Sequence, residues 1–208
     1  LSFLHAERVD MQQAGADVQG RKLNTALINS TIDRLNAHGG GTLFFPAGTY
    51  LTGSIHMKSN ITLHLESGAI VRFSDRFEDY LPFVTARWEG TVMQTLSPLI
   101  YAHSADNLTI TGRGTLDGNG LKWWLWEFET RKVIKENGGK LPSLDKLQQM
   151  WVDANKDLEI SDYYKPSLER KMFRPPFIQF YECTNILIEN VKIINSPFWT
   201  THIYKCNN

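Results

Sequence analysis

The first part of the chain carries an amphipathic helical pattern over residues 22–37. Leu27 and Leu35 fall with other apolar side chains on one face, and polar side chains occupy most of the opposite face. Three glycines at 39–41 end this pattern. From Thr42 onward, β-type runs of three to five residues alternate with Gly, Asn and Ser turns. Runs this short favour a stack of small coils over a sandwich of hairpins, whose strands are usually longer.

A motif recurs along these runs, in which a small polar residue and an asparagine precede alternating aliphatic residues. The copies are residues 59–65, 106–112 and 184–190, and a fourth begins at Cys206-Asn207. Asn185 and Asn207 are 22 residues apart, and Cys183 and Cys206 are 23 residues apart. An interval of about 20–25 residues is typical of one coil of a solenoid. We therefore predict an all-β fold, a parallel β-helix in which equivalent residues of successive coils stack.

The motif asparagines are expected to stack at one corner of successive coils in a ladder of side-chain amide hydrogen bonds. These residues are Asn60, Asn107, Asn185 and Asn207. The step of 47 residues between the first two corresponds to about two coils, with an irregular stretch near residues 77–97 looping out. The step of 78 residues between the second and the third predicts one or two coils that carry a large insertion.

The stack also suggests roles for the remaining segments of a single domain over residues 1–208. The helix over 22–37 would cap the open end of the stack, where strand edges are unpaired. Cys183 and Cys206 would lie in neighbouring coils, either as a pair of buried thiols or as a disulfide. Residues 122–171 differ in composition and form a partly helical insertion of the kind that walls a cleft or contacts a neighbour.

The insertion opens with three tryptophans, Trp123, Trp124 and Trp126. Tryptophan faces suit sugar stacking, but a tryptophan cluster also pins an insertion to its scaffold by burying large apolar rings. We favour packing for Trp123 and Trp124.

The charge balance argues against several classes of partner. The 208 residues carry 22 Lys and Arg against 22 Asp and Glu, whereas nucleic-acid and anionic-membrane binders usually have a clustered cationic excess. Hydrophobic residues make up 42% and charged residues 21%, as in globular proteins. No apolar stretch approaches the ~18 residues that cross a bilayer. His56, His64 and His103 have no Cys or acidic companion at ligand spacing. We therefore expect no nucleic acid, no membrane, no metal and no cofactor.

Several short segments also follow one another in a distinctive order. They are PAGTY at 46–50 with Gly53 and residues 58–60, RWEG at 87–90 ahead of residues 97–101, GRGTLDGNG at 112–120 followed by Trp123-Trp124, RPP at 174–176, and NSPFWTTH at 195–202. This series resembles the polygalacturonase family, glycoside hydrolase family 28, over nearly the whole chain. The RWEG segment with the run that follows it resembles the family's exo-acting or rhamnogalacturonan-directed members from bacteria and plants.

The resemblance implies a right-handed parallel β-helix that hydrolyses α-linked galacturonic acid bonds in pectin by inversion, without a metal. The expected partner is then an acidic plant polysaccharide, polygalacturonan or rhamnogalacturonan, and the expected location is secreted or periplasmic. Inversion needs a general acid and a second carboxylate that activates water, about 6.5–9.5 Å apart.

The acidic motifs that perform this chemistry in the family do not occur in the 208 residues. An Asn-Thr/Ser-Asp-Gly-x-Asp segment, an adjoining Asp pair, Gly-His-Gly and Arg-x-Lys are all missing. The last shared landmark precedes them in the family. We therefore assign no catalytic residue, and we expect the chain to stop before the catalytic coils and to be inactive by itself.

The candidate substrate-binding residues are Arg87, Trp88, Glu89, Trp199 and His202. Arg87 suits the bidentate binding of a uronate carboxylate, and Trp88 suits a sugar face on a loop that would wall a cleft. An ion pair of Arg87 with Glu89 that only ties down this loop is an equal alternative. Trp199 and His202 lie on the last complete coil, where His202 would line a subsite or, as we favour, be a satisfied internal histidine.

Two other charged residues have structural interpretations. Asp117 lies in a glycine-rich turn, where Asp commonly caps backbone amides. Arg174 comes just before Pro175 and Pro176, where the coil stack resumes after the insertion, and we expect it to anchor the chain there.

Two alternative functions remain open. A pectate-lyase-like enzyme would need an acidic cluster that binds calcium, and the sequence contains no such cluster. A non-catalytic carbohydrate-binding or structural β-helix would need no acidic motif. An acidic motif in the complete reading frame would therefore favour the hydrolase.

Overall fold

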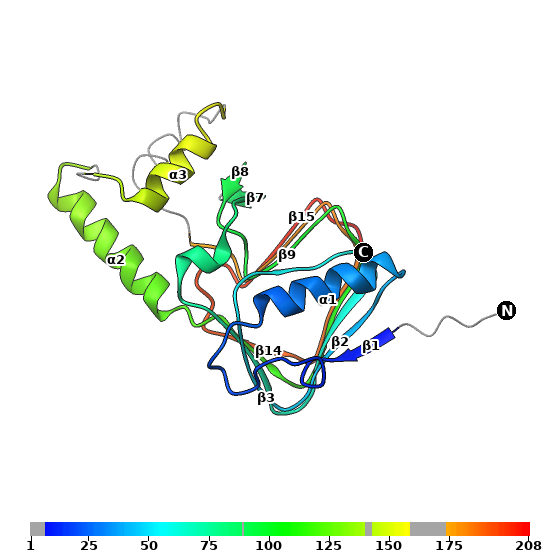
Figure 1. The fold of residues 1–208 in the computed structure, drawn as a ribbon. Coiled ribbons are helices and arrows are strands. Elements are labelled where there is room, and N and C mark those ends of the chain that lie inside the picture. Colours follow the sequence, from blue (N-terminus) through cyan, green and yellow to red (C-terminus); the bar gives the residue numbers. More distant parts are fainter. Residues whose placement is uncertain (1–6, 89, 140–142, 159–173) are drawn as a thin grey trace.

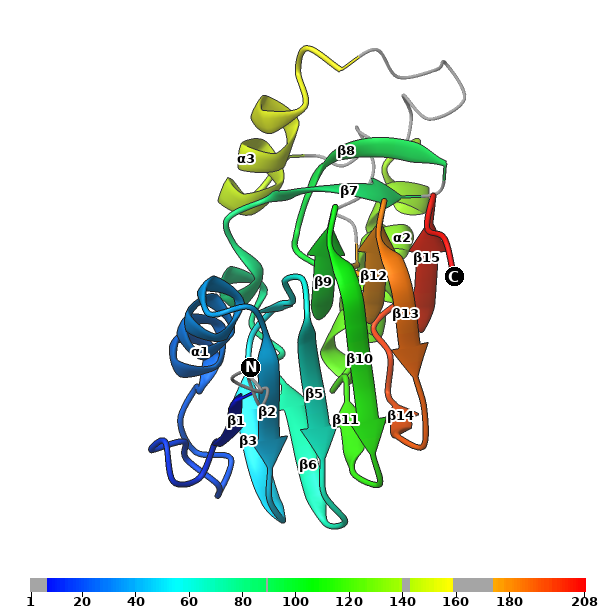
Figure 2. The same ribbon diagram turned by 90° about the vertical axis from the view of Figure 1, so that its right-hand side faces the viewer.

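The computed structural model describes residues 7–88, 90–139, 143–158 and 174–208. Three parallel sheets form its body (Figures 1 and 2). Sheet A contains β1 (Glu7–Asp10), β2 (Gly41–Phe45), β5 (Ile61–Leu65), β10 (Asp106–Gly112) and β13 (Thr184–Ile188). Sheet B contains β3 (Gly48–Thr52), β6 (Ala69–Phe73), β11 (Thr115–Asp117) and β14 (Lys192–Ile194). Sheet C contains β4 (Ile55–His56), β9 (Ile100–His103), β12 (Ile178–Tyr181) and β15 (Thr201–Tyr204).

The chain visits the three sheets in turn, so that each passage from A through B to C is one coil. Strands of the same sheet in successive coils pair in parallel and in register, with Leu43 opposite Leu63 and Leu63 opposite Ile110. Alternate side chains of each strand point to opposite faces, and these three inward residues are buried. The stacked aliphatic residues form the core, and the parallel arrangement predicted from the repeat is confirmed.

The asparagine ladder is present, but its last member is Asn208 and not Asn207 as predicted. Asn107 donates a side-chain amide hydrogen bond to Asn60 over 2.7 Å, Asn185 donates to Asn107 over 2.9 Å, and Asn208 approaches Asn185 at 3.5 Å. All four have positive φ, a conformation that asparagine tolerates better than most residues. Asn207 instead forms a backbone bridge with Thr184. The step from Asn185 to Asn208 is therefore 23 residues, which equals the step from Cys183 to Cys206.

Both long steps between asparagines are single coils, which corrects the estimate of two coils for the first of them. The step from Asn60 to Asn107 carries a 3₁₀ helix, η1 (Phe77–Tyr80), and an antiparallel hairpin of β7 (Val84–Trp88) and β8 (Thr91–Thr95). The stretch that was expected to loop out irregularly is therefore mostly regular. The step from Asn107 to Asn185 carries α2 (Leu121–Glu136) and α3 (Lys146–Ala154).

Helix α1 (Thr25–Ala37) begins three residues later than the pattern suggested. Asn24, just before it, is buried, and its side-chain amide compensates for the lost contacts with water by donating to the carbonyls of Asp17 and Leu51. Figures 1 and 2 show α1 at the end of the stack beside β2, and α1 also contacts β4. The side chain of Asn29 accepts from the His56 backbone and donates to the Ser54 carbonyl, both over 2.9 Å. It thus satisfies backbone groups at the free edge of β4.

Helix α2 is attached to the stack by its first turn. The Trp123 ring is fully buried, with its centroid 4.3 Å from that of Phe77 and 5.5 Å from that of Tyr80. The indole nitrogen of Trp124 donates to the Ser196 carbonyl over 2.9 Å. Both contacts agree with the packing interpretation.

The two cysteines are free thiols in neighbouring coils. The Cys183 backbone nitrogen lies 3.3 Å from the Cys206 sulfur. Burial raises the pKa of the Cys183 thiol, which keeps it protonated at neutral pH. Within the described ranges, no helix is both long enough and apolar enough to cross a membrane.

Candidate functional site

The outward side chains of sheet C form two ladders across the coils. The first ladder consists of His56, Tyr101, Gln179 and His202, which are opposite one another in the registers of neighbouring strands. The second ladder consists of His103, Tyr181 and Tyr204. Its rings are stacked, with centroids 4.7 Å and 5.5 Å apart. This face is therefore rich in aromatic and polar groups, which is unlike the aliphatic core on the other side of the same strands.

The β7–β8 hairpin is fastened to this face by two side chains of the first ladder. The amide of Gln179 forms a pair of hydrogen bonds with the backbone of Arg87, accepting from its nitrogen over 3.2 Å and donating to its oxygen over 2.7 Å. The hydroxyl of Tyr101 donates to the Thr85 carbonyl over 2.6 Å. Figure 2 shows the hairpin crossing beside the ends of β9, β12 and β15. Segments more than ninety residues apart in sequence are thereby joined.

These contacts place the Arg87 guanidinium over the ring of Tyr204, 4.1 Å from its centroid. Among the described residues, no carboxylate pairs with Arg87. The Nε of Arg87 is buried and has no hydrogen-bond partner among the described residues. A cation on an aromatic face suits an incoming anion.

A row of aromatic rings connects Trp88 to His202. Trp88 stacks on Phe198 with ring centroids 5.7 Å apart, and Phe198 stacks on Trp199 at 4.8 Å. Trp199 meets His202 edge to face at 4.8 Å. Trp88 is 4% exposed, whereas Trp199 is 39% exposed. The ring of Trp199 is therefore accessible to solvent. The buried ring of Trp88 packs against Phe198, which in turn packs against Trp199.

His202 is 9% exposed, and its Nδ1 lies 2.6 Å from the amide nitrogen of Gln179. Burial lowers the pKa of His202, and the positive charge of Arg87 lowers it further. Both effects disfavour the imidazolium, so the ring is neutral at pH 7. Of the predicted site residues, Arg87, Trp88, Trp199 and His202 are brought together here, and Glu89 lies outside the described residues.

The carboxylates of Asp117 and Glu182 have structural partners. Burial raises the pKa of Asp117, but hydrogen bonds from Asn195, Asn119 and Arg72 outweigh burial and lower it overall. Glu182, beside the second ladder, pairs with Lys205 and His103. The strands β9, β12 and β15 contain no Asp or Glu. Over the described ranges, no three His, Cys, Asp or Glu side chains gather to hold a metal ion. These three strands therefore supply no pair of carboxylates for general acid–base chemistry.

Arg174 has the anchoring role expected of it. Its Nη1 donates to the Pro197 carbonyl over 2.9 Å, and its guanidinium lies 5.1 Å from the centroid of the Phe198 ring. It thereby supports the aromatic row behind Trp199.

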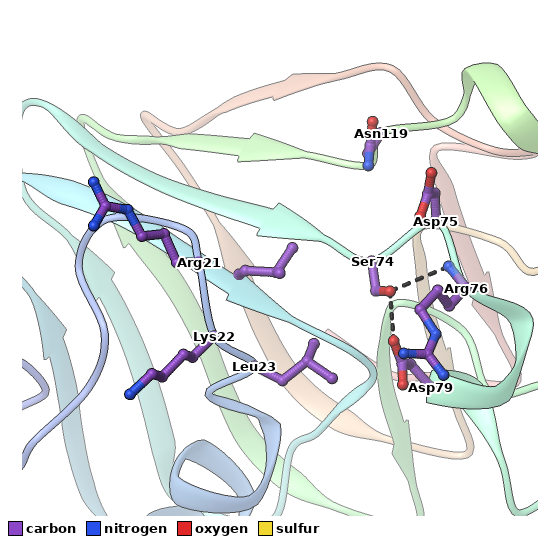
Figure 3. Close-up of a pocket in the computed structure, with 9 residues that line it drawn as sticks. Arg21, Lys22, Leu23, Ser74, Asp75, Arg76, Asp79 and Asn119 are labelled. Atoms are coloured by element: carbon purple, nitrogen blue, oxygen red, sulfur yellow. Dashed lines mark hydrogen bonds between the residues drawn. The ribbon is translucent and has the colours of Figure 1, made fainter.

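A separate cavity of about 440 Å³ lies at the ends of β3 and β6 (Figure 3). Its cationic residues are Arg21, Lys22 and Arg76. In Figure 3 the side chains of Arg21 and Lys22 point away from Arg76, which lies beside Asp79. Because these charges do not converge, we regard the outer face of sheet C as the better candidate site.

Gln179, Tyr181 and Tyr204 belong to this site, although sequence reasoning did not single them out. A signal was present, since Tyr101, Gln179 and His202 each lie six residues before a ladder asparagine. The signal depends on choosing Asn208 as the last asparagine, and the choice of Asn207 shifts the alignment by one residue. A shift of one residue in a strand exchanges its inward and outward faces.

Comparisons with known proteins agree with this structure. No family model matches the chain. A protein of Vitis vinifera named "Probable polygalacturonase" is 26% identical over 212 residues, which cover 97% of this chain and 35% of that protein. The crystal structure of a hyperthermoactive exopolygalacturonase from Thermotoga maritima is 38% identical with a TM-score of 0.74, and covers 96% of this chain and 44% of that one.

The family 28 exopolygalacturonase of Yersinia enterocolitica is 22% identical with a TM-score of 0.67, over 97% of this chain and 37% of that one, and shows the same fold. The chain thus spans between about a third and less than half of the length of these three proteins. The resemblance found in the sequence landmarks is confirmed, because the chain is similar over nearly its whole length to polygalacturonases, including exopolygalacturonases of glycoside hydrolase family 28.

Proposed function

We propose that this chain is the polysaccharide-binding part of a pectin-degrading glycoside hydrolase, and that an acidic polysaccharide lies along the outer face of sheet C. The observation that carries the proposal is the Arg87 guanidinium, stacked on Tyr204 with no carboxylate partner in the described chain. The similarity of this chain to an exopolygalacturonase supports the same substrate class, α-linked galacturonic acid.

The residues around Arg87 suit the parts of a uronate sugar. The guanidinium binds the carboxylate, because a planar fork of N–H donors matches two carboxylate oxygens. The exposed ring of Trp199 offers an apolar surface to a sugar face. His202, held neutral, adds a hydrogen bond to a hydroxyl without a charge of its own.

We propose that the complete protein hydrolyses the polymer by inversion and that the 208-residue chain alone does not. The strands of the candidate face supply no carboxylate, and inversion needs two. Both proteins should be incubated with polygalacturonate and rhamnogalacturonan while reducing ends and anomeric configuration are followed. Turnover by the short chain would contradict its proposed inactivity. An unsaturated product that absorbs in the ultraviolet would contradict hydrolysis.

The same lack of carboxylates on β9, β12 and β15 favours one second candidate, a carbohydrate-binding protein without catalysis. The two candidates differ in the complete protein. Tight binding of oligogalacturonate with no release of reducing ends would favour the binding protein, and release of ends with inversion would favour the hydrolase.

Arg87→Ala is expected to weaken the binding of trigalacturonate by about ten- to a hundredfold, because hydrogen bonds to a charged group contribute roughly 1.5–3 kcal/mol. Its backbone pairing with Gln179 does not depend on the side chain, so the hairpin should stay in place. Isothermal titration calorimetry measures the change. Arg21→Ala, in the separate cavity, is the matched control and should bind as the wild type does.

The methyl ester of trigalacturonate provides a second control, because it has the same rings without the negative charges. The ratio of wild-type to Arg87→Ala affinity should fall toward one with this ligand. An Arg87→Ala protein that binds trigalacturonate like the wild type would overturn the assigned site.

We propose two finer points of architecture on the same basis. The three sheets wind as a right-handed solenoid, because crossovers between parallel strands are right-handed in almost all known cases. Helix α1 caps the stack, supported by its bonds from Asn29 to the free edge of β4. We also propose a secreted or periplasmic location, since a polymeric substrate is met outside the cytoplasm.

A further inference from the structure

Gln179 is a fully buried amide in the middle of the first ladder. Its side chain contacts two different elements, the backbone of Arg87 on β7 and the ring of His202 on β15. A buried amide with this many partners is costly to misplace, because each unmet polar group loses its hydrogen bonds to water. The arrangement of its donors and acceptors therefore indicates which ring nitrogen of His202 carries the proton.

The backbone of Arg87 determines which end of the amide is nitrogen. The Arg87 N–H needs an acceptor and its carbonyl needs a donor, so Oε1 must face the first and Nε2 the second. The reverse orientation would place two donors together and two acceptors together. The remaining hydrogen on Nε2 is then directed to His202, whose Nδ1 lies 2.6 Å away. A ring nitrogen that accepts this hydrogen bond carries no proton.

We propose that Gln179 is a positioning residue that locks His202 as the neutral tautomer with its proton on Nε2. His202 then offers an N–H donor to the bound saccharide at its other ring nitrogen. This functional consequence rests on the proposed function, whereas the tautomer follows from the hydrogen bonds alone. Gln179 itself needs no contact with the saccharide.

The charges around His202 favour the same state. Arg87 faces the ring from β7, and its positive charge disfavours an imidazolium. Tyr204 on the same strand has its ring centroid 6.4 Å from that of His202, and Trp199 beside it carries no charge. In the described part of the chain, no carboxylate pairs with His202 to stabilise a proton on Nδ1.

The test begins with the wild-type protein, by long-range ¹H–¹⁵N correlation spectra of the histidine rings assigned through a His202→Gln variant. The expected result is a protonated Nε2 and an unprotonated Nδ1 for His202 across neutral pH. A proton on Nδ1, or an imidazolium at pH 7, would overturn the proposal whether or not any variant folds.

Gln179→Glu is the informative variant, because it has nearly the same shape but presents an acceptor where the amide presented a donor. We expect the proton of His202 to move to Nδ1 and its pKa to rise, since a carboxylate stabilises an N–H and an imidazolium beside it. Affinity for trigalacturonate should fall about tenfold or more, the effect of losing one well-placed hydrogen bond. An unchanged tautomer in a folded Gln179→Glu protein would contradict the lock.

Tyr101→Phe is the matched control, because Tyr101 also ties the hairpin to sheet C but does so through Thr85. It should loosen the hairpin and leave the His202 tautomer as in the wild type. A tautomer change in Tyr101→Phe equal to that in Gln179→Glu would show that hairpin anchoring alone sets the tautomer, and would overturn the role of Gln179. A wild-type protein with the expected tautomer that fails to bind trigalacturonate would contradict the proposed function and support this inference.

Discussion

Gly112→Ala is expected to lower the free energy of unfolding by more than about 4 kcal/mol, a loss reserved for severe defects of packing or backbone. Gly112 ends β10 opposite Leu65 of the preceding coil, with φ of 118°. A methyl group there would overlap the Leu65 carbonyl oxygen and lie 2.7 Å from its carbon and 2.8 Å from the Leu65 nitrogen. These are backbone atoms of a paired strand, so relief requires β5 and β10 to separate.

Urea unfolding followed by circular dichroism measures this loss. Gly138→Ala is the matched control, because Gly138 also has positive φ, 67°, but an added methyl group there would meet no described atom within 4 Å beyond its chain neighbours. It should cost only the ~1–2 kcal/mol of a left-handed backbone. Equal losses of stability in the two variants would mean that the backbone conformation, and not the close approach of neighbouring coils, is the reason that position 112 requires glycine.

Trp123→Ala is expected to lower the free energy of unfolding by about 3–5 kcal/mol, the usual range for removing a buried large aromatic side chain. The ring is fully buried between α2 and η1, with its closest ring contact at Phe77. The ring centroid of Trp126 lies 5.7 Å from that of Phe77, but Trp126 is only partly buried. Trp126→Ala should therefore cost clearly less in the same urea experiment.

Saccharide binding distinguishes the two interpretations of this tryptophan. If Trp123 only packs, the folded Trp123→Ala protein retains the affinity of the wild type for trigalacturonate. A stable Trp123→Ala protein that loses this affinity would instead assign Trp123 to sugar stacking.

The repeated part of the fold was predictable because its causes are local and periodic. The asparagines recur where a corner needs positive φ, and aliphatic residues recur where side chains point inward, as at Leu63 and Ile110. The hairpin and the coil count were not predictable in this way. A step of 47 residues fits two plain coils or one coil with a hairpin, and the direct pairing of β5 with β10, with Asn107 bonded to Asn60, distinguishes them.

The candidate site was predictable in part. Arg87, Trp88, Trp199 and His202 were identified by their side-chain chemistry, and the structure places them together. Their mutual arrangement depends on hydrogen bonds between segments that are distant in sequence, which residue type alone does not reveal. The amide of Gln179 illustrates this, because a glutamine within an apolar run gives no indication that Arg87 and His202 are its partners.

The most direct measurement of the central claim is a map of trigalacturonate on the 208-residue chain by NMR chemical-shift changes. We expect the largest changes in the side-chain signals of Arg87, Trp199, His202 and Tyr204, saturating with one affinity and weakening with added salt. Signals from the cavity lined by Arg21, Lys22 and Arg76 should stay in place. Saturable changes at that cavity, with none on the outer face of sheet C, would contradict the account.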